Sequence, residues 1–438
     1  MHITRRYFLK STGALAVYCG VNPLRTLAEV GLTPTDVKPV AKGKTFVAIF
    51  LRGGMDGLNF IVPYKDPNYQ GLRRTIALGS PGAPDGVLDL DGFFGIHPRG
   101  AALAPLFHNG TAMALHAVGY DLNTRSHFEE QDTWETGVTG NTVGSDGWLN
   151  RHLITSQGHG PVRAVSVGNV LPRILRGRAP AIALHGISDL TLPGMSQVDD
   201  AQVTAALEHA YCTPPREHVG AAHDLLAQTA ATTLDGINLI KAKLPTLLAA
   251  NADYPKTEFG RQLQQVAQLI KADIGLEVAE VDYGGWDTHN NQGSVAGSYG
   301  DLVQTFSEGL AAFARDLGDR MNDTLVLTMS DFGSTAAENG TAGTDHGWAN
   351  CMLALGGGLA TASAGGIVKP VLSKWPGLAK EQLHQGRDLL HTTDFRDVLG
   401  EVVSVHLGNP QIKTVLPSHD FKPVGLLKGA LPAKTAAT

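Results

Sequence analysis

Short apolar runs, each followed directly by a polar, glycine-rich segment, most constrain the fold of this 438-residue chain. The clearest run, 324–330, opens into a segment that holds Asp331, Glu338, Asp345 and His346. A short apolar run rich in β-branched residues is typical of a strand covered on both faces, as in a parallel sheet. Ligands of such sheets collect at the carboxyl ends of the strands, so we expect a site at this point of the chain.

The same pattern recurs along the chain and indicates a mostly parallel central sheet. Strands are predicted at 45–51, 112–118 and 277–283, with shorter ones at 162–167, 181–184 and 351–355. Helices are predicted at 98–108, from 126 onward, at 298–317 and at 393–407, where Thr393 or Asp394 is the expected N-cap. Since no interior linker is long enough to divide the chain, we expect one elaborated α/β domain over 44–426.

Residues 1–28 have the pattern of a twin-arginine signal peptide. Arg5 and Arg6 precede Phe-Leu-Lys and then a weakly apolar run. That run is too short, and too broken by Gly20 and Pro23, to be a permanent membrane span. We therefore expect cleavage after residue 28, the twin-arginine export machinery as a partner, and a periplasmic or secreted protein.

Three further stretches differ from the strand-rich parts in composition. Residues 29–43 contain two prolines and two glycines and are predicted to be a linker. Residues 196–273 are rich in Ala, Leu and Gln with helical spacing, which predicts a helical insertion or cap. Residues 427–438 are predicted to be a disordered tail.

The composition is that of a globular and acidic protein. With 43% hydrophobic and 17% charged residues, the chain can bury a large core. Loss of 1–28 removes four basic residues and no acid, which moves the formal net charge from −6 to −10, so we expect no binding of nucleic acid. Only Cys212 and Cys351 then remain, too few for a disulfide framework or a cysteine-ligated zinc site, although they could form one bridge.

Four of the predicted strands end in segments that carry carboxylates, imidazoles and hydroxyls. The candidate metal ligands are Asp56, Asp287, His289, Asp331 and His346, and the candidate catalytic residues are Ser126, Thr124 and His127. In a parallel sheet these strand ends lie along one edge, so the side chains can converge. Carboxylates together with imidazoles suit zinc, manganese or iron rather than calcium, and such ions can polarise a phosphoryl or sulfuryl group.

Each of these residues, taken alone, also has a purely structural interpretation. Ser126, with Glu129 three residues on, forms a capping-box pattern and can be a helix N-cap and nothing more. In that place its hydroxyl would also meet the positive end of the helix dipole, which favours its alkoxide and a bound anion. His289 and His346 can be hydrogen-bonded loop histidines, and Asp56 can be a turn residue. The metal hypothesis therefore depends on the strand ends meeting.

Eight segments match the pattern of one known family. They are the twin-arginine start, Phe-Leu-Arg-Gly-Gly-Met-Asp-Gly-Leu-Asn at 50–59, Thr-Arg-Ser-His-Phe-Glu-Glu-Gln-Asp at 124–132, Gly-Trp-Leu-Asn-Arg at 147–151, Trp-Asp-Thr-His at 286–289, Ser-Asp-Phe-Gly at 330–333, Thr-Asp-His-Gly-Trp at 344–348 and Thr-Thr-Asp-Phe-Arg-Asp-Val at 392–398. Together they resemble the exported bacterial family called domain of unknown function 1501. That family resembles the alkaline phosphatase and sulfatase superfamily, which implies a three-layer α/β sandwich with a metal-assisted hydroxyl or thiol nucleophile.

The resemblance also implies roles for individual residues. By position, Asp56 would be the first-strand metal ligand, and Ser126 or Thr124 would be the nucleophile. Asp287 and His289 would match the Asp and His from a later strand. Asp331 would match the first residue of the usual Asp-His-Gly, and His346 would be the last histidine ligand. Two departures from the superfamily's pattern leave open whether the site holds two metal ions, one or none. Phe332 stands where the superfamily usually has a ligand histidine, and Asp287 lies closer to His289 than is common there.

Three hypotheses for the function follow. The first is an exported, metal-dependent hydrolase of phosphate or sulfate esters, with Ser126 as the attacking group and a small anionic ester or glycan as the substrate. The second is a non-catalytic periplasmic or envelope binding protein that keeps the fold with a degenerate metal site, which the residue at 332 favours. The third is an unrelated redox enzyme, which is weaker because the sequence has no dinucleotide fingerprint, so we expect no nucleotide cofactor.

Overall fold

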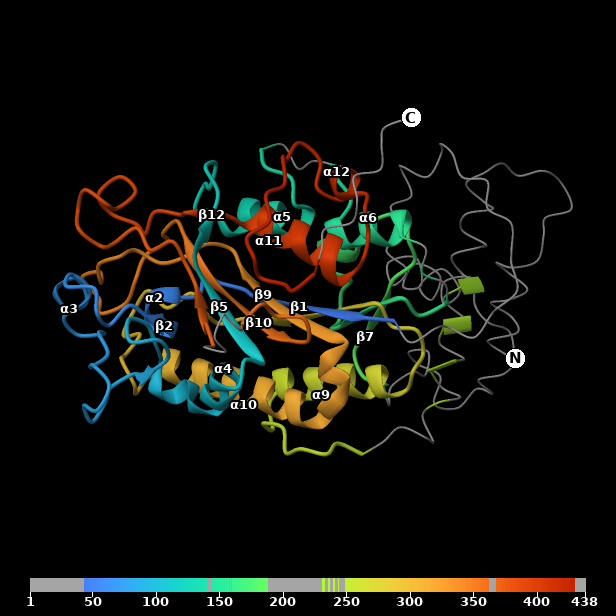
Figure 1. Cartoon of the computed structure of the whole chain (residues 1–438), viewed down its shortest axis with the longest axis horizontal. Helices are drawn as coiled ribbons and strands as arrows, with labels where there is room; N and C mark the ends of the chain where they lie inside the picture. The colour runs from blue at the N-terminus through green and yellow to red at the C-terminus, as the bar shows by residue number, and fades with distance from the viewer. Residues whose placement is uncertain are drawn as a thin grey trace, which may run out of the picture.

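The computed structural model describes residues 43–187 and 249–429, apart from 141–143, 157, 159 and 362–367, together with scattered positions between 231 and 243. Its centre is a mixed, mostly parallel sheet with helices on both faces, as predicted (Figure 1). The predicted signal 1–28, Cys212 and most of the predicted insertion 196–273 lie outside the described residues. None of the described helices is both long enough and apolar enough to cross a bilayer.

Seven strands of the main sheet fall where the apolar runs predict them. In spatial order the strands of this sheet are β11 (Val371–Leu372), β5 (Ala112–Gly119), β10 (Asn350–Gly356), β9 (Thr324–Ser330), β1 (Thr45–Leu51), β8 (Val278–Tyr283), β6 (Ala164–Val167) and β7 (Ile182–Leu184), and β12 (Thr393–Asp394) also pairs with β5. The predicted strands are β1 and β5 to β10, whereas β11 and β12 were not predicted. A small second sheet consists of β2 (Ile61–Val62), β4 (Gly95–Ile96) and β3 (Leu88–Asp89).

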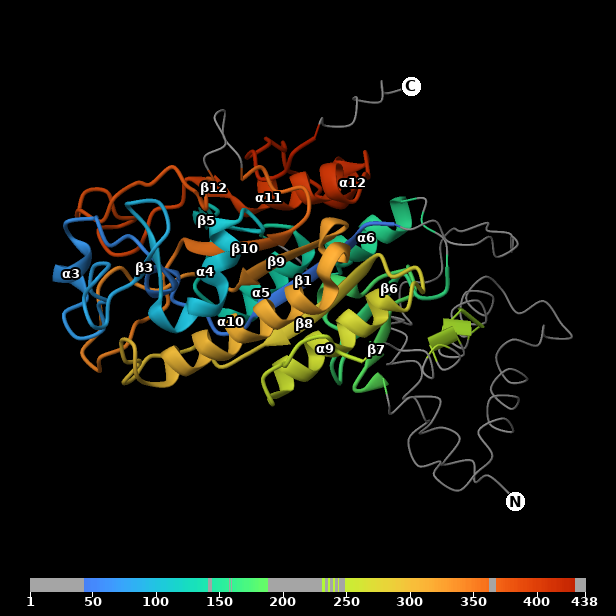
Figure 2. The same cartoon turned by 60° about the horizontal axis from the view of Figure 1, so that its bottom comes forward.

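Helices cover the two faces of the main sheet, and Figure 2 shows both layers. One face carries α4 (Ala104–His108), α9 (Glu258–Lys271) and α10 (Ser298–Leu317), and the other carries α5 (His127–Thr136), α6 (Trp148–Thr155), α11 (Phe395–Glu401) and α12 (Ile412–Val415). Shorter helical turns are α2 (Gly57–Phe60), α3 (Tyr69–Leu72), η1 (Pro98–Leu103), η2 (Arg173–Leu175), η5 (Gly318–Asn322) and the π turn η6 (Val402–His406).

Alternate side chains of β1 enter two separate cores, because successive residues of a strand point to opposite faces. Val47 and Ile49 join the core under α9 and α10, whereas Phe46 and Ala48 join the core under α5, α6 and α11. All four are fully buried. The apolar runs without polar alternation therefore reflect a sheet covered on both faces.

β10 runs antiparallel to both of its neighbours, β9 and β5, whereas the other pairings of the main sheet among the described residues are parallel. β9 therefore ends and β10 begins at the same edge, with residues 331–349 between them. This reversal brings both Asp331 and His346 to the carboxyl edge of the parallel strands. We call residues 331–349 the edge loop.

One predicted helix start and one predicted capping box differ from the structure. Thr393 and Asp394 form the short strand β12, and the helix begins at Phe395. Asp394 is its N-cap, as predicted, and its carboxylate accepts a hydrogen bond from the amide of Arg396. α5 begins after Ser126 as predicted, but the Ser126 hydroxyl makes no capping hydrogen bond. The expected capping box is therefore absent.

The ends of the predicted insertion and tail also differ from expectation. The last part of the insertion, α9, packs on the sheet beside α10 and belongs to a covering layer. At the carboxyl terminus, Leu427 is buried and its amide donates to Oε1 of Glu401 at 2.6 Å. The ordered domain thus continues at least through the first residues of the predicted tail.

Candidate metal centre

Three histidines and one aspartate from three separate segments meet at the carboxyl edge. Nε2 of His289 lies 2.9 Å from Oδ1 of Asp287 and 3.1 Å from Nε2 of His346. Nε2 of His346 lies 3.4 Å from Oδ1 of Asp287, and Nε2 of His127 lies 3.6 Å from its Oδ2. We call His127, Asp287, His289 and His346 the histidine cluster. Within the described residues, His127, Asp287 and His346 are the one group in which each side chain offers a ligand atom within 4.8 Å of the others.

In all three histidines Nδ1 faces an oxygen, which leaves Nε2 turned toward the cluster. The partners are Oδ2 of Asp331 for His127 at 2.5 Å, the carbonyl of Arg125 for His346 at 2.9 Å, and Oδ1 of Asp345 for His289 at 3.3 Å. A carbonyl oxygen only accepts, so His346 donates from Nδ1 and keeps a lone pair on Nε2. Metal-ligating histidines are oriented in this way.

The separations in the histidine cluster suit a metal ion. Ligand bonds of about 2.0 to 2.1 Å in a tetrahedral arrangement place donor atoms about 3.4 Å apart. The four measured separations lie between 2.9 and 3.6 Å. In addition, Nε2 of His127 is buried without a hydrogen-bond partner, which is unusual for such an atom. The donor set of imidazoles and one carboxylate fits zinc, manganese or iron.

The cluster is accessible to a ligand from solvent while its support is buried. The side chain of Asp287 is 47% exposed and those of the three histidines are between 24% and 34% exposed. Asp331, which holds His127, is fully buried. A substrate could therefore approach the cluster from solvent without displacing Asp331, although Nε2 of His127 is itself buried.

The protonation of His127 is coupled to its two carboxylate neighbours. Its hydrogen bond to Asp331 raises the pKa of His127, burial opposes the rise, and the charges of Asp331 and Asp287 add to it. A protonated imidazole cannot ligate an ion, so binding of a cation there would displace the proton.

Two glycines after β1 allow the cluster to form. The amide of Gly53 donates to Oδ2 of Asp331 at 3.0 Å, and Gln131 adds a longer contact at 3.4 Å. A Cβ at Gly53 would lie 2.6 Å from the amide nitrogen of Asp287, and one at Gly54 would lie 2.4 Å from the ring of Phe332. Both residues have positive φ. Only glycine permits this approach without strain.

Asp56, predicted as a metal ligand, has a different partner in the structure. Nη1 of Arg73 donates to Oδ2 of Asp56 at 2.5 Å, and Nε2 of Gln292 donates to the same oxygen at 2.7 Å. Arg73 and Asp56 are both almost fully buried, and the rest of the guanidinium donates to the carbonyls of Thr335 and Ala336. We call Asp56, Arg73 and Gln292 the arginine centre. A carboxylate neutralised by a buried arginine is a structural ion pair, so the prediction of Asp56 as a ligand finds no support.

Asp331 also takes another place than predicted. Its Oδ2 accepts from the Nδ1 of His127, the amide of Gly53 and the amide of Gln131. Through this oxygen Asp331 orients His127, whereas its Oδ1 is buried without a hydrogen-bond partner. Asp287, His289 and His346 do lie together, as the convergence of strand ends predicts.

The two candidate hydroxyls differ in their surroundings. The Thr124 hydroxyl donates to Oε1 of Glu130 at 3.0 Å, and its amide donates to the same oxygen. The Ser126 hydroxyl makes no capping hydrogen bond. In sequence Ser126 lies between His127 and Arg125, and the carbonyl of Arg125 accepts a hydrogen bond from His346. Arg125 has a φ of 58°, an uncommon backbone conformation that aims this carbonyl at His346. Of the two candidate nucleophiles, Ser126 is therefore the one whose hydroxyl makes no capping hydrogen bond.

Sequence reasoning missed the place of His127 among the candidate metal ligands and the groups that support it. Arg52 donates to Oδ1 of Asp282 at 2.7 Å and to Gln131 at 3.0 Å, and Gln131 in turn reaches Asp331. One signal was available for His127. As the first residue of a helix that follows a strand end, it had to lie at the carboxyl edge.

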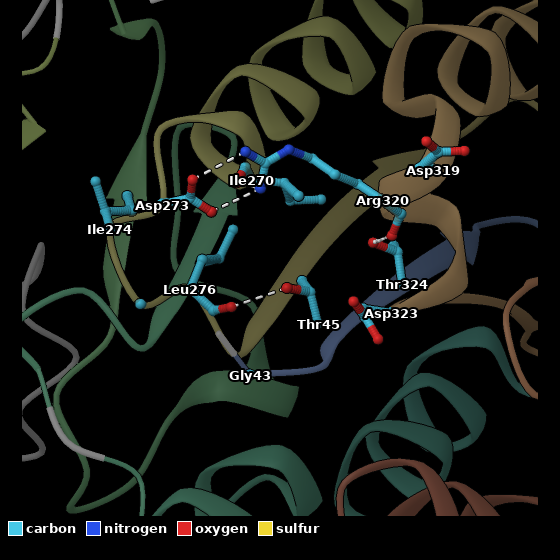
Figure 3. A pocket seen from close by; sticks show the side chains of 11 residues that line it. Gly43, Thr45, Ile270, Asp273, Ile274, Leu276, Asp319, Arg320, Asp323 and Thr324 are labelled. Atoms are coloured by element: carbon cyan, nitrogen blue, oxygen red, sulfur yellow. Dashed lines mark hydrogen bonds and ion pairs between the residues drawn. The ribbon is translucent and has the colours of Figure 1, made fainter. Parts of the chain in front are cut away.

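The amino edge of the sheet holds a cavity of about 280 Å³ that no prediction addressed (Figure 3). Thr45 and Thr324, which begin β1 and β9, line it together with Asp319 and Asp323. Its arginine, Arg320, donates to both carboxylate oxygens of Asp273 at 2.6 and 2.8 Å, as the dashed lines show. The described residues around it include no histidine, so it differs in chemistry from the carboxyl edge.

The fold and the histidine cluster define a class, that of a layered α/β protein with a metal-capable centre at the carboxyl edge of its sheet. A family model described as "Protein of unknown function (DUF1501)" matches residues 112–411, more than half of the chain, and the chain belongs to that family. This confirms the family predicted from the sequence segments.

Individual relatives are distant. Over 133 residues the chain is 30% identical to a steryl-sulfatase of Rattus norvegicus, and this match spans 30% of the chain and 22% of that protein. Similar solved structures include the C-terminal periplasmic domain of EcEptC from Escherichia coli in complex with Zn (9% identity, TM-score 0.35, 74% of this chain and 77% of that chain). They also include the PsFucS1 sulfatase from Pseudoalteromonas sp. (12% identity, TM-score 0.33, 76% and 65%) and an alkaline phosphatase from the Antarctic bacterium TAB5 (9% identity, TM-score 0.28, 76% and 95%). At such low scores the chemistry of the site must be argued from its own residues.

Proposed function

We propose that the protein is an exported, metal-dependent hydrolase of phosphate or sulfate esters. The observation that carries the proposal is the histidine cluster, in which three Nε2 atoms and one carboxylate point at one another and every histidine is held through Nδ1. His127, Asp287 and His346 would ligate one divalent ion, and His289 lies beside the last two, 2.9 Å from Asp287 and 3.1 Å from His346. A bound ion would polarise an oxygen of the phosphoryl or sulfuryl group.

The start of α5 supports the binding of an anion beside the cluster. The amides of the first turn of a helix have no intrahelical acceptor, and the Ser126 hydroxyl does not cap them. These amides and the helix dipole favour a negatively charged group. Because His127 is the first residue of α5, the anion site and the metal ligand share one turn of the chain.

Ser126 would carry out the attack on the ester. Its Oγ forms a bond to phosphorus or sulfur while the bond to the leaving oxygen breaks, and the Oγ proton ends on the alcohol that departs. A water molecule then cleaves the seryl ester and restores the hydroxyl, which releases phosphate or sulfate. The lack of a capping bond on the Ser126 hydroxyl supports this role.

Metal analysis and a panel of phosphate and sulfate esters test the proposal on the same protein. We expect about one zinc, manganese or iron ion per chain in the wild type, and ester turnover that Ser126→Ala lowers by about a thousandfold or more without loss of the ion. Thr124→Val is the matched control, because that hydroxyl is bonded to Glu130, and it should keep most of the activity. Wild-type protein without an ion and without turnover contradicts the proposal.

A binding protein that takes up anionic ligands without turnover is the second candidate. The ring of Phe332 packs against those of His127 and His346, with centroids 4.7 and 4.5 Å apart, at the position where the superfamily usually supplies a histidine. Because the side chain of Phe332 offers no ligand atom, the cluster would hold one ion. An intact ion with anion binding that survives Ser126→Ala, and no hydrolysis of any ester, would favour this function.

The proposed localisation rests on the sequence of residues 1–28. Export by the twin-arginine route would deliver the protein already folded, with its ion in place. Replacement of Arg5 and Arg6 by lysine should keep the full-length protein in the cytoplasm, which fractionation of cells would detect.

A further inference from the structure

Arg52 lies at the end of β1, beside the loop that carries Asp287. Its amide donates to the carbonyl of Tyr283, the last residue of β8, at 3.0 Å. Its carbonyl accepts a hydrogen bond from the amide of Trp286, which directly precedes Asp287, at 3.3 Å. The backbone of Arg52 therefore continues the pairing of β1 with β8 and holds the loop on which Asp287 lies.

The side chain of Arg52 connects β8 to α5. Its Nε donates to Oδ1 of Asp282, on β8, at 2.7 Å. Its Nη1 donates to Oε1 of Gln131 at 3.0 Å and lies 2.9 Å from Oε1 of Glu135, and both of these residues belong to α5. Residues four positions apart share one face of a helix, so Gln131 and Glu135 lie on the face of α5 that also carries His127. One guanidinium thus bridges α5 and β8.

Two routes lead from Arg52 to the atom that holds His127. Nε2 of Gln131, which Arg52 contacts, lies 3.4 Å from Oδ2 of Asp331. The amide of Gly53, the next residue in the chain, donates to the same oxygen at 3.0 Å. That oxygen lies 2.5 Å from Nδ1 of His127. A shift of Arg52 would therefore disturb the orientation of His127 through both routes.

The bridge between α5 and β8 requires an arginine. Burial lowers the pKa of Arg52, but the charges of Asp282 and Glu135 raise it by more, so the guanidinium stays protonated. Its rigid, planar fork donates from Nε and Nη1 in two directions at once, whereas a lysine has one ammonium nitrogen. Arg52→Lys therefore keeps the charge and loses the bridge.

We propose that Arg52 is a positioning residue for the candidate metal ligands, which sets the distance between His127 and Asp287 and with it the metal affinity of the histidine cluster. These two ligands come from the segments that Arg52 holds, and their Nε2 and Oδ2 atoms lie 3.6 Å apart. Groups that orient metal ligands contribute about ten- to a hundredfold to metal affinity. The inference rests on the metal site of the proposed function, but it does not require that an ester is hydrolysed.

Zinc affinity, measured on the full-length protein by competition with a fluorescent chelator, tests the inference. Arg52→Lys is expected to lower the affinity by about tenfold or more. Arg320→Lys is the matched control, because Arg320 is a partly exposed arginine that pairs with Asp273 at the amino edge, and it should bind zinc like the wild type. Wild-type zinc affinity in Arg52→Lys overturns the inference.

The metal spectrum distinguishes positioning from a general loss of stability. At saturating cobalt(II), the visible absorption of the bound metal reports the geometry of its ligands. Arg52→Lys should change this spectrum and Arg320→Lys should not. An unchanged spectrum in Arg52→Lys would mean that the bridge serves stability alone, and the inference would be overturned.

A double-mutant cycle tests the route through Gln131 with the ion pairs of Arg52 intact. Gln131→Ala should lower zinc affinity by about tenfold in the wild-type background. In the background of Asp331→Asn its effect should shrink to within about twofold, because both changes act on the hydrogen bond at Oδ2 of Asp331. Fully additive effects of the two changes would contradict this route and the positioning role with it.

The outcomes separate this inference from the proposed function. Zinc binding that depends on Arg52, in a protein that hydrolyses no ester, would support the inference and contradict hydrolysis. Ester turnover together with a zinc affinity that Arg52→Lys leaves unchanged would do the reverse. A wild-type protein that binds neither zinc nor cobalt would contradict both.

Discussion

The histidine cluster and the arginine centre both use an aspartate that follows a strand of the same sheet edge, yet they differ in what faces the carboxylate. Asp56 meets the guanidinium of Arg73 and the amide of Gln292, and both residues of the ion pair are almost fully buried. Asp287 meets the Nε2 atoms of three histidines and is 47% exposed. The first carboxylate has its cation built into the chain, whereas the second is arranged to receive one.

This difference separates a structural from a functional carboxylate. In the arginine centre, the guanidinium also binds two carbonyls of the edge loop, so the pair fixes the loop that carries His346. In the histidine cluster, the hydrogen bonds are on the outer side, at Nδ1, and the inner atoms face one another. The orientation of donors, and not the residue type alone, assigns the two roles.

The largest effect is expected from breaking the arginine centre. Arg73→Met leaves the buried carboxylate of Asp56 without its cation, which costs about 3–5 kcal/mol of stability. Urea unfolding followed by circular dichroism measures the loss. The double variant Arg73→Met with Asp56→Asn should recover part of the stability, and a single variant as stable as the wild type would mean that the pair is not structural.

Removal of the central carboxylate of the histidine cluster should act on metal binding and spare stability. Asp287→Ala is expected to lower the affinity for zinc by about a hundredfold or more, since it removes a ligand and not only an orienting group. Competition with a fluorescent chelator measures the affinity. Asp323→Ala at the amino edge is the control, and equal zinc affinities of the two variants would contradict the assignment of the cluster.

A smaller loss of metal affinity is expected when only the orientation of His127 is disturbed. In Asp331→Asn the acceptor of the Nδ1 proton is weakened while all ligands remain, which should cost about ten- to a hundredfold in zinc affinity. The same competition assay applies. A loss as large as that of Asp287→Ala would indicate that Asp331 is itself a ligand.

Acid should destabilise the protein through three buried histidines. Burial lowers the pKa of His97, His116 and His406 to about 4, and the charge of Asp56 acts on the first two. In the unfolded chain the pKa is about 6.5, so between pH 6.5 and 4 the unfolded state binds more protons and stability falls as the pH falls. Melting temperatures from pH 8 to 5 check the slope, which should be shallower in His116→Gln. A flat profile below pH 6.5 would contradict the burial of these groups.

The smallest effect is expected at the amino edge. The pair of Arg320 and Asp273 is partly exposed, at 30% and 51%, so Arg320→Gln should cost less than about 1 kcal/mol and leave zinc affinity unchanged. Urea unfolding and the chelator assay measure both quantities. A change in zinc affinity would link the cavity of Figure 3 to the carboxyl edge and remove the contrast between the two edges.

The sheet and its functional edge could be predicted because strand runs such as 45–51 and 324–330 are apolar throughout, and a polar segment after each can lie only at a carboxyl end. Asp287, His289 and His346 follow from that argument. The reversed direction of β10 could not be predicted, since its run is as apolar as those of its neighbours. That reversal explains why the edge loop begins and ends at the site.

The roles of Asp56 and His127 were beyond the sequence for another reason. Arg73 lies in a loop whose path has no sequence signature, so nothing in the spacing reveals that its guanidinium would reach Asp56. His127 was predicted as a catalytic residue of a polar strand end, whereas in the structure its Nδ1 is held by Asp331 and its Nε2 faces Asp287. Side-chain direction depends on contacts from distant segments, which local patterns do not encode.

The ligands of the histidine cluster come from the start of α5, from the loop after β8 and from the edge loop. A bound ion would therefore cross-link three stretches of chain that follow different strands. Loading and the final docking of these stretches would then be one event, and a chelator would loosen all three at once. In the proposed hydrolase, the ion would stabilise the tertiary structure as well as take part in the reaction.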